Sequence, residues 1–365
     1  ATMYLEGLDQ YRGWFQSSLL TAVGAFGQGA PFKECVTHGW TVDGEGKAMH
    51  KSLGNGVDPA DVFNENGADI LRLWAASADY HADVRCSKEI FKQLSQNYLK
   101  FRNTCKFMLD NLVDFDPAHL TKAEDMPVLD RWLITKLNEL IEKVEQSYND
   151  YEFHIITHAV NDFCVTTLSS FYLDIVKDRL YCDGADSLSR RSAQTALYLT
   201  LHTLSKLFAP ILAFTCDEIW LAMPHTGEDD ARNVVLNEMN KPFTAYALTA
   251  EEMANWEKLA EVRTVVNGVL EAARAEKKIG KSLEADVHLT VPAEDAFLAN
   301  VDGKELADLL IVSQVEVTVG DSVKASAEEA AGTKCPRCWK HSPAANADGL
   351  CPRCAEVMRS FPDLA

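Results

Sequence analysis

Four of the ten cysteines lie in two copies of one short motif near the end of the sequence. Cys335-Pro336-Arg337-Cys338 and Cys351-Pro352-Arg353-Cys354 are separated by twelve residues. Each pair can present two thiolates from one tight turn, and two such turns complete a tetrahedral shell for Zn²⁺. Because four thiolates leave no open coordination position, the pattern predicts one structural zinc site. A disulfide or redox dithiol pair is the alternative, which a doubled motif in a reducing compartment disfavours.

A second candidate for chemistry is the stretch 43–59, DGEGKAMHKSLGNGVDP, in which glycines flank a short cationic loop. Glycine permits backbone angles that other residues avoid. The ammonium group of Lys51 is a compact point charge on a flexible stem, which suits it to gripping phosphates. A solvated hairpin without function is the alternative, because turns rich in glycine and lysine are common.

The elements expected around this loop are those of an α/β domain. The stretch 10–25 is predicted to be helical, and 34–37 to form a short strand that leads to His38. Nucleotide-binding α/β sheets bind ligands at the carboxyl ends of their strands, where the loop would lie. A helix at 68–78 would close this piece. Glu6, at a strand end, can contact a ligand, or its carboxylate can stabilise the positive N-terminus of the following helix.

The region 127–223 shows the clearest architecture. Apolar residues recur at helical spacing and predict a bundle of packed helices, with Asp130 able to cap the first. Thr249 and Glu252 form a capping-box pair for a further long helix. Alternating residues at 287–291 and 315–319 predict strands of a small α/β unit. The stretch 322–332 is typical of a linker.

Length and composition bound the class of protein. A chain of 365 residues should hold two or more domains, and the net charge of −19 argues against wholesale coating of nucleic acid. This charge does not exclude a local basic track, and the amphipathic helical stretch 87–112 is a candidate for one, with a solvated helix face as the alternative. The six other cysteines are expected to be reduced, packed thiols. No apolar run is long enough for a bilayer and no secretory signal is present, so a cytoplasmic protein is expected.

Three stretches together resemble the isoleucyl-tRNA synthetase family of class I aminoacyl-tRNA synthetases. Residues 47–52 are similar to the KMSKS signature, with Lys51 as its second lysine and Ser52 as its last serine. Residues 6–15 (EGLDQYRGWF) resemble the family's EGxDQxRGWF stretch, and 67–74 (GADILRLW) continue the resemblance in the family's order.

Two positions depart from the signature. Ala48 and His50 stand where the family usually has lysine and serine, and either change could slow closure of the loop. Lys47, one place earlier, is a candidate substitute for the lost charge, and Lys51 keeps the central role.

The resemblance implies a mainly α chain with α/β parts. The expected domains are the C-terminal part of a Rossmann-type catalytic domain with the KMSKS-like loop (1–60), a helical connection (61–120), an α-helical anticodon-binding domain (121–282), a small α/β unit with its linker (283–331) and a C-terminal zinc ribbon (332–365). Similar ribbons occur in certain DNA-repair glycosylases, so the ribbon alone would not identify the family.

By the same resemblance, the chain is expected to be the C-terminal portion of an isoleucine–tRNA ligase, which activates isoleucine with ATP and passes it to tRNA(Ile). Mg²⁺ is expected to accompany the ATP. The implied site residues are Lys51 for catalysis, Glu6, Asp9 and Gln10 for the aminoacyl-adenylate, Lys51, Ser52 and Met49 for ATP, and Cys335, Cys338, Cys351 and Cys354 for zinc. The arginines of both cysteine turns, with Lys334, Lys340 and Trp339, are expected to give the tail a basic face for RNA.

Class I enzymes also hold ATP with a His-x-Gly-His turn, which this sequence lacks, because His38-Gly39 is followed by Trp40. The N-terminal half of the same protein is therefore expected to be missing, and the isolated chain is expected to be inactive and monomeric. A non-catalytic, zinc-containing tRNA-binding module is the alternative.

Overall fold

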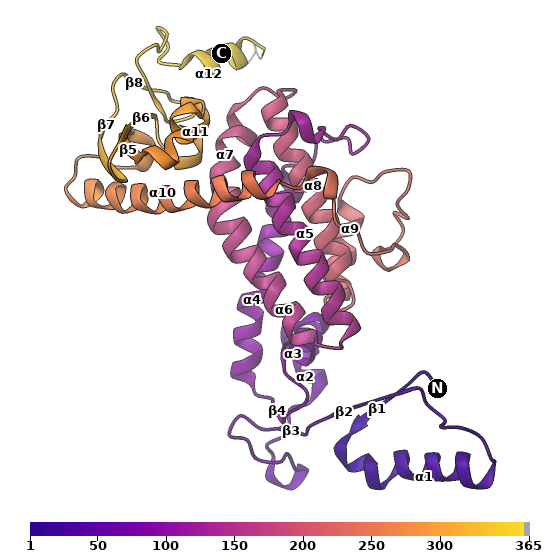
Figure 1. The fold of residues 1–365 in the computed structure, drawn as a ribbon. Coiled ribbons are helices and arrows are strands. Elements are labelled where there is room, and N and C mark those ends of the chain that lie inside the picture. The colour runs from indigo at the N-terminus through magenta and orange to yellow at the C-terminus, as the bar shows by residue number, and fades with distance from the viewer. Residues whose placement is uncertain (361–365) are drawn as a thin grey trace.

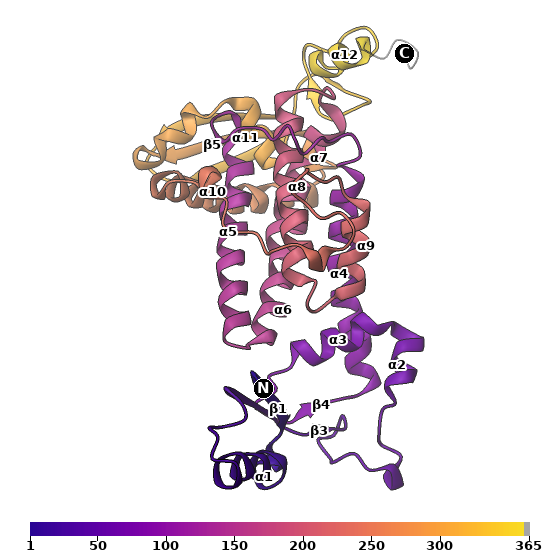
Figure 2. The same ribbon diagram turned by 90° about the vertical axis from the view of Figure 1, so that its right-hand side faces the viewer.

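The computed structural model describes residues 1–360, including every side chain in this range except that of Lys51. The last five positions of the predicted ribbon, 361–365, lie outside the described residues. The molecule is elongated, with a helical bundle in the middle (Figure 1). A small unit of two strands and a helix lies at the N-terminal end, and a second sheet and the cysteine-rich tail lie at the opposite end (Figure 2).

The N-terminal unit is built on two parallel strands. β1 (Met3–Gly7) pairs with β2 (Glu34–His38) so that Glu6 lies opposite Thr37. The crossover consists of a 3-10 turn, η1 (Leu8–Arg12), the helix α1 (Trp14–Leu20) and a π-helical turn, η2 (Thr21–Ala25). The predicted strand at 34–37 is confirmed. The predicted helix is also present, but its regular part begins at Trp14 rather than at Gln10.

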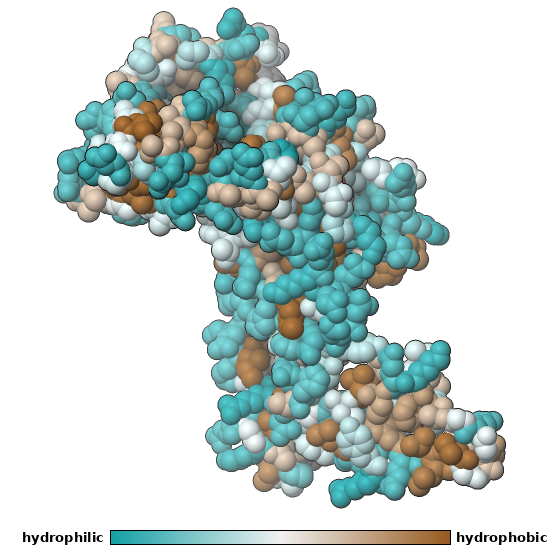
Figure 3. Space-filling model, viewed as in Figure 1, coloured by the Kyte–Doolittle hydropathy of each residue, from teal (hydrophilic) through white to brown (hydrophobic). Residues whose placement is uncertain are grey.

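This unit leaves much of its apolar surface uncovered. Figure 3 shows apolar side chains gathered over it. The largest exposed apolar side chains here are those of Leu5, Leu8, Tyr11, Trp14, Leu20, Val23 and Phe26. A two-stranded sheet with one helix is too small to bury both of its faces.

The KMSKS-like loop is held between short strands and two helices. β3 (Thr41–Val42) pairs in parallel with β4 (Val84–Arg85). Between them lie the loop with its 3-10 turn η3 (Lys51–Leu53), α2 (Pro59–Asn66) and α3 (Ala68–Ser77). α2 begins where Asp58 caps Ala60 and proline occupies the first turn. α3 confirms the helix predicted at 68–78.

The bundle consists of long amphipathic helices whose apolar stripes face one another. Its elements are α4 (Lys88–Asp110), the 3-10 turn η4 (Ala123–Asp125), α5 (Val128–Asn149), α6 (Phe153–Asp162), the π-helical η5 (Phe163–Tyr172), α7 (Leu173–Cys182), α8 (Leu188–Phe208) and α9 (Ala213–Ala222). Tyr172 and Trp220 are among the largest fully buried side chains. The predicted helical bundle is therefore confirmed.

Asp130 does not cap a helix, so that prediction was wrong. α5 begins at Val128 after Pro127, which places Asp130 inside the first turn with 0% of its surface exposed. Its carboxylate instead accepts hydrogen bonds from Arg179 (Nη2–Oδ2 2.6 Å, Nη1–Oδ1 3.0 Å) and from Tyr172 (2.8 Å). A carboxylate removed from water needs such partners, because burying an unpaired charge is costly.

A second α/β unit follows the bundle. After two 3-10 turns, η6 (Val234–Leu236) and η7 (Thr244–Tyr246), the chain forms α10 (Ala250–Ala275), η8 (Ser282–Glu284), β5 (Ala285–Pro292), η9 (Ala293–Asn300), α11 (Gly303–Leu310), β6 (Gln314–Gly320) and β7 (Lys324–Glu329). β5 is the central strand, parallel to β6 and antiparallel to β7. The predicted capping box at Thr249 and Glu252 and both predicted strands are confirmed. α10 packs against the sheet, and its Trp256 stacks on Trp132 of α5 at 5.3 Å between ring centres.

The stretch 322–332 is not simply a linker, because residues 324–329 form β7. Ala327 lies opposite Val287 and Ala325 opposite Leu289. These alanines are half-buried at alternate positions of the strand. Because the stretch is rich in polar and small residues, its alternation of half-buried and exposed positions is not evident from the sequence.

The tail is a small motif at the end of the described chain. β8 (Thr333–Lys334) pairs with β9 (His341–Ser342) in antiparallel fashion, and α12 (Pro352–Arg359) follows. Within residues 1–360, no helix combines the length and hydrophobicity needed to cross a bilayer.

Candidate functional site

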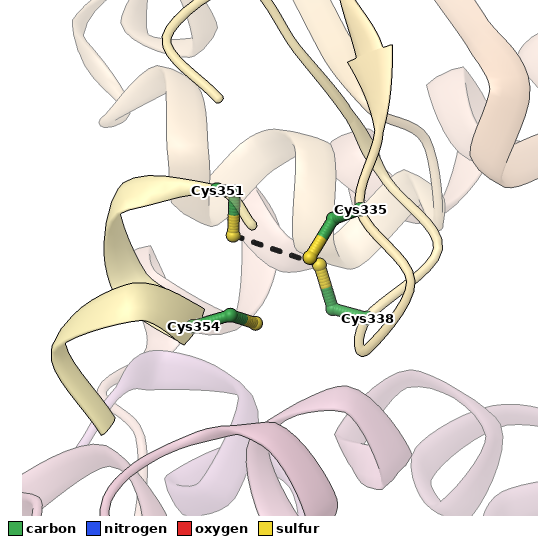
Figure 4. Close-up of side chains that lie close together, drawn as sticks. All are labelled: Cys335, Cys338, Cys351 and Cys354. Carbon is green, nitrogen blue, oxygen red and sulfur yellow. Dashed lines mark hydrogen bonds between the residues drawn. The ribbon is translucent and has the colours of Figure 1, made fainter. Parts of the chain in front are cut away.

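The four motif cysteines converge in the tail (Figure 4). Their Sγ atoms all lie within 4.8 Å of one another, and those of Cys338 and Cys351 are 3.8 Å apart. Because Zn–S bonds of about 2.3 Å place tetrahedral thiolates about 3.8 Å apart, this spacing fits a four-thiolate zinc site. A disulfide requires about 2.05 Å, so these two sulfurs are not bonded to each other.

The surroundings of Cys335 favour the thiolate that a metal requires. Burial raises its pKa, but the backbone amides of Cys338, Cys351 and Arg337 donate to its sulfur and lower the pKa to about 6. Burial raises the pKa of Cys338 and Cys354, and a bound cation would offset this effect. The donor set and its geometry therefore fit one structural zinc ion, as the sequence predicted.

The basic face predicted for the tail is wrong for its two arginines, because both are used inside the chain. Arg353 binds Asp178 through two hydrogen bonds (2.6 and 2.8 Å) and Asp183 through a third (3.0 Å). Arg337 donates to the backbone carbonyls of Cys182 and, at 3.1 Å, Tyr181. The cysteine turns are thus docked on the end of α7.

The two lysines predicted for that face are paired as well. Lys334 contacts Glu284 at 2.6 Å, and Lys340 forms an ion pair with Asp308. Trp339 remains at the surface with 54% of its area exposed, and the Nζ atom of Lys281 lies 5.3 Å from its ring centre. Of the five residues predicted for this face, Trp339 is the one that is exposed and has no side-chain hydrogen bond or ion pair among the described residues. Lys281, which lies beside it, was not part of that prediction.

The KMSKS-like loop is a compact hairpin. Asp43 and Asn55 lie at its two ends and are joined by a hydrogen bond of 2.8 Å. Lys47, the candidate substitute for the lost lysine, pairs with Glu45 at 2.6 Å, so its charge is partly neutralised. The backbone of Lys51 begins η3, and its side chain lies outside what the structure describes.

The two other predicted ATP-binding residues have different settings. Met49 is half-buried and packs against a small core formed by Val62, Ile70, Cys86 and Phe91. Its side chain therefore anchors the loop to α2, α3 and α4. Ser52 is exposed beside Lys51, where it is free of packing constraints.

The predicted adenylate residues lie on the N-terminal unit. Glu6 is exposed on β1. Gln10 caps α1, since its Oε1 atom accepts from the backbone N–H of Trp14 at 2.9 Å, and its Nε2 atom donates to Asp9 at 3.0 Å. Asp9 and Gln10 therefore support the start of α1. Among the described residues, the side chain of Glu6 has no hydrogen-bond partner.

A cavity of about 580 Å³ lies between the β1–β2 sheet and the end of the bundle. Its walls are mostly apolar and include Leu5, Val36, Trp74, Tyr148 and Phe153. Among the described residues, none of the predicted site residues lines it. The cavity is thus not lined by Glu6 or by the described side chains of the loop.

α3 fixes the loop region to the bundle through two charged residues that the sequence did not single out. Asp69 accepts from the backbone N–H of Thr215 at 2.8 Å and from its hydroxyl at 2.6 Å, at the N-terminus of α9. Arg72 donates to the carbonyls of Pro210 (2.7 Å) and Ile211 (2.9 Å), just after α8. An acid at a helix N-terminus and a cation beside a helix C-terminus both match the helix dipole. The sequence signal that could have pointed to Asp69 and Arg72 is a pair of opposite charges three residues apart on one predicted helix.

The cations of α4 differ from the four basic residues of α7 and α8 that are paired with carboxylates. Lys177, Arg179, Arg190 and Arg191 are paired with Asp174, Asp130, Asp114 and Asp186 at 2.6 to 3.0 Å. On α4 only Lys106 has an acidic partner among the described residues, Asp110 at 2.7 Å. The exposed cations of α4 without such a partner there are Lys88, Lys92, Lys100 and Arg102. α4 therefore carries the most available positive charge of the bundle.

Three family models match the chain. Residues 1–87 match the class I tRNA synthetases (I, L, M and V), residues 130–289 the anticodon-binding domain of tRNA ligase, and residues 332–357 the zinc finger found in FPG and IleRS. The chain belongs to the class I tRNA synthetases.

Within this class, the matching relatives are isoleucine–tRNA ligases. The chain is 46% identical to those of Moorella thermoacetica and Caldicellulosiruptor saccharolyticus, over 99% and 98% of its own length. It spans about 40% and 39% of these relatives. The predicted family is confirmed, and the chain corresponds to a portion of these proteins.

Solved structures agree on the fold. A LeuRS from Agrobacterium radiobacter, in a ternary complex with tRNA and LeuAMS, superposes with a TM-score of 0.54 at 16% identity, covering 87% of this chain and 37% of that one. A Mycobacterium tuberculosis methionyl-tRNA synthetase in complex with methionyl-adenylate gives 0.53 at 18% identity, covering 65% and 46%. The fold predicted from the sequence, mainly helical with small α/β parts and a zinc ribbon, is confirmed.

Proposed function

We propose that this chain is the portion of an isoleucine–tRNA ligase that supplies the KMSKS-like loop, the tRNA-binding bundle and the zinc tail. The observation that carries the proposal is the match to isoleucine–tRNA ligases along 98% to 99% of the chain. The reaction is the ATP-dependent activation of isoleucine to its adenylate, followed by transfer to tRNA(Ile). ATP, isoleucine, tRNA(Ile) and the rest of the same enzyme are the proposed partners.

In this reaction the protein mainly positions charge. Activation transfers the adenylyl group to the isoleucine carboxylate and releases pyrophosphate, so negative charge accumulates on the leaving phosphates. Lys51 neutralises that charge, with Ser52 beside it and Met49 as the anchor of the loop. Glu6 holds the adenylate from the β1 side, while Asp9 and Gln10 keep the start of α1 in place. Such positioned charges stabilise the transition state strongly, because the protein has them aligned before the reaction begins.

The domain boundaries proposed for these roles remain 1–60, 61–120, 121–282, 283–331 and 332–365. The protein is proposed to be cytoplasmic and monomeric. The zinc ion is structural, since four cysteine ligands leave no position for substrate.

tRNA is proposed to lie along α4 and to reach the surface of the tail. Lys88, Lys92 and Arg102 lie near one face of α4, because their spacings bring them close to the same side of the helix. Their ammonium and guanidinium groups can neutralise phosphates. Trp339 and Lys281 offer an aromatic ring and a cation, a combination that suits a nucleic acid base and its backbone.

A non-catalytic tRNA-binding module is the competing function, and one experiment separates the two. The chain replaces the matching portion of the Moorella thermoacetica isoleucine–tRNA ligase, and isoleucine-dependent ATP–pyrophosphate exchange is measured. An active hybrid supports the enzyme. A hybrid that binds tRNA and lacks exchange, although it is folded, supports the module.

A further inference from the structure

The ends of the KMSKS-like loop are joined by side chains rather than by a ladder of backbone hydrogen bonds. β3 is only two residues long, and one isolated bridge joins Val42 to Ala48. The remaining backbone contacts within the loop are turn bonds, such as Asp43 N–H to the carbonyl of Lys47 at 2.9 Å. Two polar side chains supply the other connections.

Asn55 holds the central part of the loop. Its Oδ1 atom accepts from the backbone N–H of His50 at 3.0 Å, and its Nδ2 atom donates to the carbonyl of Ala48 at 3.1 Å. The same Nδ2 atom donates to Asp43 Oδ2 at 2.8 Å. Asn55 therefore binds the backbone on both sides of Met49, immediately before Lys51.

Asp43 holds the first half of the loop. Its Oδ1 atom accepts from the backbone N–H groups of Glu45 (3.0 Å) and Lys47 (2.9 Å), while its Oδ2 atom binds Asn55. Gly46, between these two donors, adopts a φ of +85°, which a residue with a side chain rarely does. The carboxylate thus requires the turn that the glycine permits.

We propose that Asp43 and Asn55 are positioning residues that latch the KMSKS-like loop in the shape that presents Lys51. The proposal rests on the proposed function of Lys51. Within residues 43–55, the latch contacts residues 48 and 50 through their backbone C=O and N–H groups only. The loop can therefore keep its shape with alanine and histidine at the positions where the family's signature has lysine and serine.

The latch is only partly buried, so it can open as a loop that closes on phosphates requires. Asp43 and Asn55 are both half-buried, and their hydrogen bonds to the loop backbone lie where water can replace them. Hydrogen bonds from the amides and from Asn55 lower the pKa of Asp43, so it stays ionised and accepts all its bonds at neutral pH.

The first test is amide hydrogen exchange of the full chain, which needs no enzymatic activity. Asn55→Asp keeps the acceptor for His50 but loses the donor to Ala48 and places a second carboxylate against Asp43. Exchange at residues 45–50 should become about tenfold faster, as expected for losing a hydrogen bond of typical strength. Asn64→Asp, on the exposed side of α2, is the control and should change nothing. The double variant Ala48→Lys/His50→Ser should keep the protection of the parent chain.

A charge swap tests whether the contact itself matters. In Asp43→Asn/Asn55→Asp the amide of residue 43 can donate to the carboxylate of residue 55, and both residues keep their acceptors for the backbone. This pair should recover most of the protection that Asn55→Asp loses. The latch proposal would be overturned if amide exchange at residues 45–50 were unchanged in Asn55→Asp. It would also be overturned if the swap and Asn55→Asp lost the same amount of protection.

The second test uses the hybrid with the Moorella thermoacetica enzyme. Asn55→Asp should raise the KM for ATP or lower kcat in pyrophosphate exchange by about tenfold, and the swap should restore it. Loss of protection without any kinetic effect in an active hybrid would overturn the positioning role. If the hybrid has no exchange activity at all, the proposed function fails, while the hydrogen-exchange measurements still decide whether the latch exists.

Discussion

Arg353 of the zinc-binding turn binds both carboxylate oxygens of Asp178 on α7, at 2.6 and 2.8 Å. Both side chains are less than one fifth exposed, at 19% and 18%. A guanidinium in this geometry matches a carboxylate with two parallel hydrogen bonds. The arginine of this motif is therefore a structural contact between the tail and the bundle.

Arg353→Ala should release the tail from α7. The substitution leaves Asp178 with its charge unpaired in a mostly buried position, which should destabilise the docked tail by about 2 kcal/mol. Hydrogen exchange in α12 and in the last turn of α7 should rise together. Arg359→Ala, in the same helix and without an acidic partner among the described residues, is the control. Equal exchange in both variants would contradict the docking role.

Zinc should be present at one equivalent per chain. Elemental analysis of protein expressed with sufficient metal tests this directly, and well under half an equivalent would refute the four-thiolate site. Cys338→Ser should unfold the tail selectively, because metal binding and folding of such a motif are one event. The far-ultraviolet circular dichroism of the bundle should be retained.

Acid should weaken the contact between the 112–122 connection and α8. Hydrogen bonds from Arg190 lower the pKa of Asp114 from 3.8 to about 2. A carboxyl group with a depressed folded-state pKa stabilises the fold at pH values above its unfolded pKa, and this stability is lost as pH falls through the folded pKa. Asp114→Asn should therefore reduce the loss of stability between about pH 4 and pH 2, measured by urea unfolding at each pH. Asp110→Asn, on the exposed end of α4, serves as a control, and an identical pH dependence in Asp114→Asn and the parent would contradict the prediction.

tRNA binding should depend on α4 and on salt. Lys88→Ala/Lys92→Ala should weaken binding to different tRNA sequences by similar factors and reduce the slope of log affinity against log salt by about 1 for each phosphate that is no longer neutralised. Lys258→Ala removes a lysine of α10 that is paired with Glu261 at 3.3 Å, and it should have little effect. A gel-shift that does not change between low and moderate salt would argue against this surface.

Local pattern was enough to predict much of this molecule. The apolar stripes of the bundle, the capping box at Thr249 and the doubled cysteine motif each depend on residues close in sequence, and all three are present. The failures involve partners far apart in sequence. Asp130 looked like a cap because its partner Arg179 is 49 residues away, and Arg353 looked like an RNA contact because Asp178 is 175 residues away.

The KMSKS-like loop shows another limit of prediction from the sequence. Its resemblance to the KMSKS signature identified Lys51, but Asn55 was not recognised, because its role depends on backbone atoms that the loop brings to it. Asp69 and Arg72 escaped notice for the same reason, since the helix ends that they bind are more than 130 residues away. Residues that hold backbone groups leave only weak signals in side-chain patterns.

The most direct test of the proposed function is isoleucine-dependent ATP–pyrophosphate exchange with three proteins: the isolated chain, the hybrid and the hybrid carrying Lys51→Ala. The isolated chain should be inactive, because no His-x-Gly-His turn is present in its sequence to share the binding of ATP. The hybrid should be active, and Lys51→Ala should lower its rate on the order of 100-fold, as for loss of one preorganised charge-stabilising group. Exchange by the isolated chain that survives Lys51→Ala, or a hybrid indifferent to that substitution, would contradict the assignment of this loop to the active site.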